Sequence, residues 1–246
     1  MLEVKWCGID FGQCLMEPTG LRTYLVIGDI YKQLGQPEKI PEAIKKFRVI
    51  VEAYGGHSLL KESHRDKIYS YVLEDNPEAI ELFAIKERDY LSVGEGAEEA
   101  LSYLNDQGIE VNVVAELKKT LGAMGKDIVT GFLQSKKLLH YFCNLYTPQG
   151  KIDLRNGAID ESYKGKTKES GELYKQLVEE VKKRGIKPEE MVMVGDKIAT
   201  DINPPHKLGM RTIQYTGYID MGPSDADYRI ASFYELKNLV RGLKNG

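Results

Sequence analysis

The chain has 246 residues, of which 42% are hydrophobic and 29% charged, enough to bury one large core with an insert or two smaller cores. Its 34 lysines and arginines against 37 aspartates and glutamates give a net charge of −3. Neither sign forms a long block, so the sequence offers no electrostatic surface for nucleic acid or an anionic membrane. No apolar run reaches the ~18 residues of a membrane span, and the start lacks the order of a secretion signal. We therefore expect a cytoplasmic protein with a small soluble partner or substrate.

The cysteines and histidines form neither a disulfide pattern nor a metal-binding pattern. Cys7, Cys14 and Cys143 are odd in number and lack a CxxC spacing, and the 4 histidines show no HExxH motif. We expect reduced, mostly buried thiols and no histidine-ligated metal.

The first predicted element is a buried strand over residues 4–9, which are apolar and rich in branched and aromatic side chains. Asp10 would then lie at the carboxyl end of this strand. From residue 19 to about residue 90, apolar residues recur at three- and four-residue intervals, a spacing typical of helices. This stretch predicts an all-helical insert between two strands.

Strands and helices alternate in the rest of the chain. An amphipathic helix closed by Gly108 precedes an apolar strand over residues 109–116, and two helical patterns precede a third strand, FCNLY. Asn156 and Gly157 between alternating apolar residues predict a hairpin. An amphipathic helix ending at Gly185 then leads into the strand of MVMVGD, and RTIQYTG and DYRIAS are the last two predicted strands. The alternation predicts an α/β fold with a doubly wound, mostly parallel sheet and a helical insert.

Four candidate positions follow predicted strands: Asp10, Ala115, Asp196 and Asp201. Ligands of open α/β sheets bind outside the carboxyl ends of the strands. Three carboxylates meeting there would repel one another without a proton or a hard cation, and oxygen ligands suit Mg²⁺. An aspartate on a rigid strand end can also attack phosphorus and form a covalent intermediate. For Asp196 alone, a helix N-cap is an equally common role.

Three segments resemble motifs of the haloacid dehalogenase (HAD) superfamily, and the resemblance covers nearly the whole chain. GIDFGQCL is similar to the family's strand followed by Asp-x-Asp-Gly-Thr-Leu, which puts Asp10 on the nucleophile. VMVGDKIATDINPPHKLGMRTI resembles the family's strand, Gly-Asp, four residues, Asp, and helix ending in Gly-Met. KTKESGELY resembles the lysine-led segment before a helix, which makes Lys168 the candidate for the lysine that neutralises the nucleophile and the phosphoryl group, with Lys166 as the alternative.

This resemblance implies a Rossmann-like core over residues 1–17 and 92–246 and a C1-type helical cap over residues 18–91. It implies Mg²⁺-dependent hydrolysis of a small phosphorylated metabolite through an aspartyl-phosphate on Asp10, with Lys168 as second catalytic residue. The implied metal ligands are Asp10, the backbone of Gly12, Asp196 and Asp201. The implied phosphate-binding positions are Gly12, Ala115, Glu116 and Lys166.

Three positions depart from the family pattern. Gly12 replaces the second aspartate, whose family role is general acid and base, and Cys14 replaces a threonine. Ala115 stands where a serine or threonine holds a phosphoryl oxygen. A positioned acid or base contributes about 10²- to 10⁴-fold in rate and one oxyanion donor about 10²- to 10³-fold. The departures predict a slow hydrolase or one with a non-standard proton donor.

Other functions stay open at this point. The insert contains His57, Lys61 and His64 near paired glycines, and relatives that cleave a phosphorus–carbon bond recruit such a cap residue. A catalytically inactive relative that binds a ligand or a protein is the main alternative. Dehalogenation, which needs no metal, is a third, although the pair Asp196 and Asp201 looks adapted to a metal. A homodimer also stays open.

Overall fold

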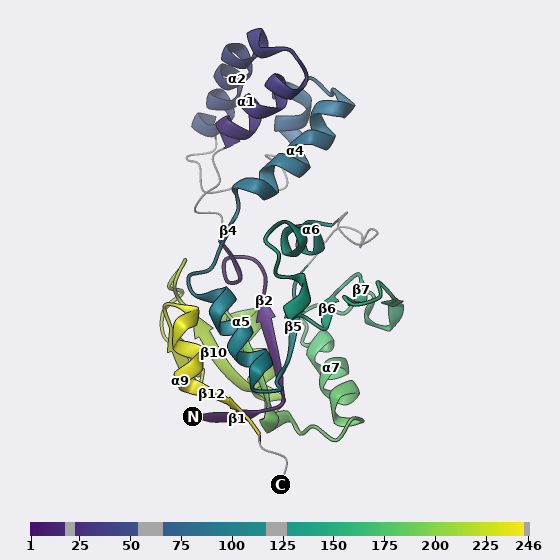
Figure 1. Ribbon diagram of the computed structural model, residues 1–246, viewed down its shortest axis with the longest axis vertical. Helices are drawn as coiled ribbons and strands as arrows, with labels where there is room; N and C mark the ends of the chain where they lie inside the picture. The colour runs from purple at the N-terminus through teal and green to yellow at the C-terminus, as the bar shows by residue number, and fades with distance from the viewer. Residues whose placement is uncertain (18–22, 54–65, 117–126, 244–246) are drawn as a thin grey trace. The chain divides into compact units, whose positions relative to one another are not determined.

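The computed structural model describes residues 1–17, 23–53, 66–116 and 127–243 (Figure 1). The chain divides into two compact units. The core unit contains Met1–Glu17 and Ser92–Gly246, and the helical unit contains Pro18–Leu91. Among the described residues, none of the helices combines the length and apolar character that crossing a membrane requires.

The described part of the core unit is built on an 8-stranded sheet with the order β11-β10-β9-β2-β5-β6-β7-β8. Neighbours from β11 to β6 pair in parallel, and β7 and β8 extend the sheet in antiparallel pairs. This confirms the predicted α/β fold with a mostly parallel sheet. The strands are β2 (Trp6–Asp10), β5 (Glu110–Val114), β6 (Asn144–Thr147), β7 (Gly150–Asp153), β8 (Ile159–Asp160), β9 (Met191–Gly195), β10 (Arg211–Tyr215) and β11 (Tyr228–Ile230).

The register of the central strands decides which residues share an edge of the sheet. Every residue of β2 and β9 is buried, as expected for parallel strands with neighbours on both sides. Asp10 pairs with Val114, and Ile9 pairs with Val194. The residues that follow Val114 and Val194 therefore lie at the same edge as Asp10.

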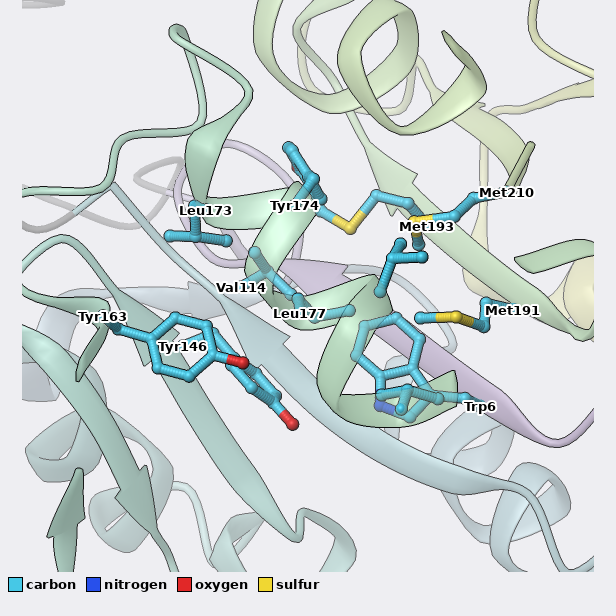
Figure 2. Close-up of a cluster of buried hydrophobic side chains, with 12 residues drawn as sticks. Trp6, Val114, Tyr146, Tyr163, Leu173, Tyr174, Leu177, Met191, Met193 and Met210 are labelled. Carbon is cyan, nitrogen blue, oxygen red and sulfur yellow. The ribbon is translucent and has the colours of Figure 1, made fainter. Parts of the chain in front are cut away.

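Helix α7 (Glu172–Lys182) covers one face of the sheet next to this edge. Its buried side chains pack with Trp6, Val114, Met191 and Met193 from three strands, as Figure 2 shows. Apolar residues recur along one side of α7 and charged residues along the other, so the apolar side packs against the sheet. The contact holds the segment before α7, which contains Lys168, close to the sheet.

The remaining elements of the core unit are short. The helices are α5 (Ala97–Asp106), α6 (Ile128–Ser135), α8 (Asn203–Lys207) and α9 (Leu236–Leu239), with a π-helical turn at Ile198–Ile202 and 3₁₀ turns at Leu139–Tyr141, Glu161–Tyr163, Pro188–Glu190 and Phe233–Glu235. Strand β3 (Met16–Glu17) pairs with β4 (Ser92–Val93). The predicted hairpin around Asn156 and Gly157 is confirmed, because β7 and β8 pair on either side of it.

Two details of the sequence prediction are wrong. The predicted strand over residues 4–9 is divided at Lys5, whose backbone N–H donates to the Glu190 carbonyl at 2.8 Å. Strand β1 (Leu2–Val4) lies outside the main sheet and pairs with β12 (Val240–Gly242). The sequence analysis missed β12, because three residues are too few to show a strand periodicity.

The described residues of the helical unit form helices and turns only. They are α1 (Thr23–Gln33), α2 (Ile40–Ala53), α4 (Pro77–Tyr90), a 3₁₀ turn at Pro37–Lys39 and a π-helical turn at Ile68–Val72. Their buried faces form one apolar cluster that includes Ile27, Phe47 and Phe83. Asn76 caps α4 by accepting from the N–H groups of Glu78 and Ala79. The unit therefore has a hydrophobic core of its own.

Candidate active site

Three buried aspartates meet at the carboxyl edge of the sheet. Asp10 ends β2, Asp196 follows β9, and Asp201 lies in the π-helical turn after it. One carboxylate oxygen of each lies within 4.8 Å of the others. The sequence placed all three at strand ends, and the structure brings them into one cluster, which we call the carboxylate cluster.

A glycine gives Asp201 its place in the cluster. A Cβ atom at Gly195 would lie 2.5 Å from the Cβ of Asp201, closer than two non-bonded carbon atoms can approach. The backbone N–H of Lys197 donates to Asp201 Oδ2 at 3.0 Å, and the N–H of Asp201 donates to the Lys197 carbonyl at 2.7 Å. The missing side chain at residue 195 therefore lets the turn fold back over the end of β9.

Lys168 is the cation of the carboxylate cluster. Its Nζ donates to Asp10 Oδ1 and to Asp201 Oδ1, the latter at 2.6 Å, and its side chain is 1% exposed. Its backbone N–H donates to Glu116 Oε2 at 2.9 Å. Glu116 is exposed, so in this structure its carboxylate anchors the Lys168 segment to the end of β5.

Lys166, the alternative lysine, lies elsewhere. Its Nζ donates to the Ser162 carbonyl at 2.8 Å, and the residue is partly exposed. Of the two candidate lysines in the loop between the 3₁₀ turn at Glu161–Tyr163 and α7, only Lys168 therefore reaches Asp10.

The charges in the carboxylate cluster do not balance. Burial raises the pKa of Asp10 to about 7; the Lys168 charge opposes this and the Asp201 charge adds to it. Burial and then the Asp201 charge raise the pKa of Asp196 to about 6. Burial alone would lower the pKa of Lys168, but the charges of Asp10 and Asp201 outweigh it and hold that pKa well above its ordinary value. Lys168 bonds to two of the three carboxylates, and the Lys197 charge opposes the rise in the pKa of Asp196. The negative charge among the described residues is still in excess, which favours a proton or a cation.

Asp196 shows where a cation would fit. Both of its carboxylate oxygens are buried, and neither has a hydrogen-bond partner in the described part of the chain. The N-cap role is therefore wrong for Asp196, because such a cap accepts from backbone N–H groups. A buried carboxylate without partners costs free energy unless it is neutralised. An all-oxygen donor set of Asp10, Asp196 and Asp201 fits a hard divalent cation such as Mg²⁺.

Comparisons with known proteins agree with this geometry. Residues 167–230, which include Lys168, Asp196 and Asp201, match the model of the HAD-hydrolase-like family. Over this segment the chain is similar to HAD-like hydrolases. Over 67 residues it is 42% identical to the glyceraldehyde 3-phosphate phosphatase of Methanocaldococcus jannaschii, a match that covers 26% of this chain and 29% of that protein. The chain thus matches less than a third of the length of this relative.

Solved structures of HAD proteins share the fold over almost the whole chain. The HAD-hydrolase YfnB of Bacillus subtilis, bound to magnesium, superposes with a TM-score of 0.58 at 12% identity and covers 96% of this chain and 98% of its own. The HAD phosphatase of Thermococcus onnurineus has a TM-score of 0.54 at 20% identity, covering 96% and 97%. Identities this low show the fold alone.

The three departures from the HAD motifs lie on the loop after Asp10 and at the end of β5. Gly12 is partly exposed, and a Cβ atom added there would meet nothing within 4 Å. Cys14 is buried, and its thiol donates to the Val194 carbonyl at 3.9 Å. Ala115 is buried, and its N–H donates to the Tyr146 carbonyl at 2.9 Å. Their side chains thus supply no carboxylate or hydroxyl.

Backbone hydrogen bonds nevertheless define the conformation of the loop after Asp10. The N–H of Leu15 donates to the Asp10 carbonyl at 3.2 Å, and the N–H of Met16 donates to the Phe11 carbonyl at 2.8 Å. The carbonyl of Gly12 takes part in neither bond. The metal-ligand role of this carbonyl, which the HAD resemblance implies, stays a prediction.

Sequence reasoning missed Tyr174 and Gly195 as neighbours of the cluster. The hydroxyl of Tyr174 is buried without a hydrogen-bond partner in the described residues, and burial raises its pKa while the Lys168 charge opposes this. On the amphipathic pattern of α7, Tyr174 looks like an ordinary core residue. The three cap residues considered as proton donors, His57, Lys61 and His64, lie outside the described residues.

Proposed function

We propose that this HAD-like protein hydrolyses a small phosphorylated metabolite in an Mg²⁺-dependent reaction that passes through an aspartyl-phosphate on Asp10. The observation that carries the proposal is the buried carboxylate cluster with Lys168 at its centre. Strongly perturbed carboxylates gathered at the end of an α/β sheet favour a reactive site over a structural one. The match of residues 167–230, which contain Lys168, Asp196 and Asp201, to the HAD-hydrolase-like family model and the local similarity to the phosphatase from Methanocaldococcus jannaschii support the same class.

Each residue has a role in this proposal. A carboxylate oxygen of Asp10 attacks phosphorus, and the bond from phosphorus to the ester oxygen breaks with its electron pair on that oxygen. Water then attacks the phosphorus, phosphate leaves, and the Asp10 carboxylate is regenerated. Lys168 holds Asp10 in place and neutralises charge near the phosphoryl group. Asp10, Asp196, Asp201 and the carbonyl of Gly12 would hold Mg²⁺, which supplies charge neutralisation for phosphoryl oxygens.

The helical unit is proposed to be the specificity cap. It is inserted between β3 and β4, the position that C1-type caps occupy in the HAD resemblance. Its own apolar core fits a unit that folds as a separate body. The substrate would then be selected by its side chains.

The test is turnover of an aryl phosphate with Mg²⁺ and with a chelator, using wild type and Asp10→Asn. We expect metal-dependent turnover that falls to background in Asp10→Asn. Asp127→Asn is the matched control, because Asp127 is also a buried aspartate but caps α6, a role that asparagine fills equally well. Turnover that survives in Asp10→Asn would refute the proposed nucleophile.

A catalytically inactive binding protein is the rival, and the departures at Gly12 and Ala115 favour it. It predicts that Mg²⁺ raises the melting temperature while a panel of phosphates, phosphonates and haloacids gives no turnover. A dehalogenase would instead release halide from a haloacid in the presence of a chelator. These assays on one purified protein therefore distinguish the three functions.

A further inference from the structure

The loop after Asp10 contains an open position at Gly12. A Cβ atom there would meet nothing within 4 Å, and the residue is partly exposed. The backbone φ of Gly12 is not among the positive values of this chain, so the position would accept other residues without strain. The missing side chain is therefore not required by the packing of the loop, unlike the missing side chain at Gly195.

The neighbouring side chains of this loop do not compensate for Gly12. Phe11 is buried with its ring 5.4 Å from that of Phe132. The Cys14 thiol is directed to the Val194 carbonyl, and Leu15 is fully buried. Gln13 cannot donate a proton, because its amide does not titrate. The segment from residue 11 to residue 15 thus provides a phosphoryl site with no proton donor of its own.

We propose that this site selects phosphoryl donors whose leaving group departs as a stable anion, with acyl phosphates, the mixed anhydrides of a carboxylic and phosphoric acid, as the preferred class. The inference rests on the proposed phosphatase function. It concerns which substrates the site can hydrolyse when residue 12 has no acidic side chain to donate a proton. Alkyl phosphates are the disfavoured class.

The chemistry of the leaving group carries this selectivity. When Asp10 attacks an acyl phosphate, the phosphorus–oxygen bond breaks and a carboxylate leaves with the electron pair. A carboxylic acid has a pKa of about 4, so this anion needs no proton. An alkoxide is about as basic as hydroxide and far more basic than a carboxylate, so it needs a proton as it departs. A positioned acid is worth about 10²- to 10⁴-fold for such a group.

The second step lacks help as well. Water must attack the aspartyl-phosphate and lose a proton, and Gly12 cannot accept it. With an acyl phosphate the first step is fast and the second is slow, so the phosphorylated form of Asp10 accumulates. The leaving group is then released in an initial burst of one equivalent per chain, followed by slower steady turnover.

The experiment is a leaving-group series with Mg²⁺: acetyl phosphate, an aryl phosphate and an alkyl phosphate such as glycerol phosphate. The variants are wild type, Gly12→Asp and Gly12→Asn, with Asp10→Asn as the blank for spontaneous hydrolysis. Gly12→Asp should raise kcat/KM for the alkyl phosphate by about 10²- to 10⁴-fold and change that for acetyl phosphate far less. Gly12→Asn has the same size but no acid, so it should not reproduce the gain. Intrinsic differences between the substrates cancel in this comparison.

Intact-mass spectrometry of wild type quenched in acid during turnover of acetyl phosphate gives a second readout. We expect one added phosphoryl group, located on Asp10, and little of it in Gly12→Asp. If Gly12→Asp does not fold, the wild-type series and the trapped phosphoprotein decide the inference.

The outcomes are distinguishable. If wild type hydrolyses alkyl and acyl phosphates with similar kcat/KM, a proton donor comes from another part of the chain, and the inference is wrong while the proposed function stands. If no phosphate is turned over and Asp10 is never phosphorylated, the proposed function itself is wrong. Selective hydrolysis of acetyl phosphate with a burst supports both.

Discussion

Asp127 and Asp196 are both buried aspartates of the core unit, yet their surroundings are opposite. Asp127 precedes α6 and accepts from the N–H groups of Val129 and Thr130 at 2.9 and 2.8 Å and from the Thr130 hydroxyl at 2.5 Å. Asp196 follows β9, and neither of its oxygens has a partner among the described residues. The chain supplies hydrogen bonds to the carboxylate of Asp127, whereas the described residues supply none to the carboxylate of Asp196.

This difference is the one expected between a structural carboxylate and a carboxylate that binds a ligand. A buried charge is tolerated when hydrogen bonds replace the water it has lost, and Asp127 has three such bonds. Asp196 receives no such bond from the described residues and lies beside two more carboxylates. A protein keeps such a residue at a cost in stability, which is the usual signature of a site that acquires its partner from outside. Three predictions test this reading of the two residues.

The largest effect is expected at Lys168. Lys168→Met removes the ammonium that bonds to Asp10 and Asp201 and leaves both carboxylates buried without a counter-charge. Breaking a buried ion pair in this way costs about 3–5 kcal/mol, so the free energy of unfolding in urea with a chelator should fall by about that amount. Lys151→Met is the control, because the pair of Lys151 with Glu180 is only partly buried. Equal losses in the free energy of unfolding would show that the ion pairs of Lys168 contribute no more to stability than the partly buried pair of Lys151 with Glu180.

The second effect has opposite signs at the two aspartates. Asp127→Ala removes the cap of α6 and should lower the free energy of unfolding by about 1–2 kcal/mol. Asp196→Ala removes an unpartnered buried charge and should raise it by about 1–3 kcal/mol at pH 7.5 without metal. The same variant should lose most of the rise in melting temperature that Mg²⁺ gives wild type. Destabilisation by Asp196→Ala would mean that its carboxylate has a stabilising partner and would break the comparison.

The sequence alone predicted the carboxylate half of this site well. Asp10 and Asp196 each follow an apolar run, and parallel strands bring their carboxyl ends to one edge. Asp201 follows five residues later in a spacing shared with HAD proteins. Strand ends are local features, so a pattern within a few residues is enough to place them.

The partners of these aspartates could not be predicted in the same way. Lys168 reaches Asp10 across 158 positions of the chain, and only the loop geometry before α7 distinguishes it from Lys166. The role of Glu116 in phosphate binding stays a prediction, and the bond that its carboxylate accepts from the Lys168 N–H is a long-range contact that no local pattern indicates. For Asp196, no pattern distinguishes a cap from an unpartnered carboxylate, because the difference lies in which N–H groups face it.

The smallest effect is the pH dependence of the difference between wild type and Asp196→Ala. The pKa of Asp196 is raised from 3.8 to about 6 in the folded chain, so between these values the folded state binds a proton that the unfolded state has released. The contribution of Asp196 to stability is therefore favourable at low pH and is lost as pH rises through this window. The advantage of Asp196→Ala, measured by urea unfolding with a chelator, should shrink from pH 7 to pH 4. An advantage of Asp196→Ala that stays constant over this range would show that packing, and not the buried charge, is what the substitution relieves.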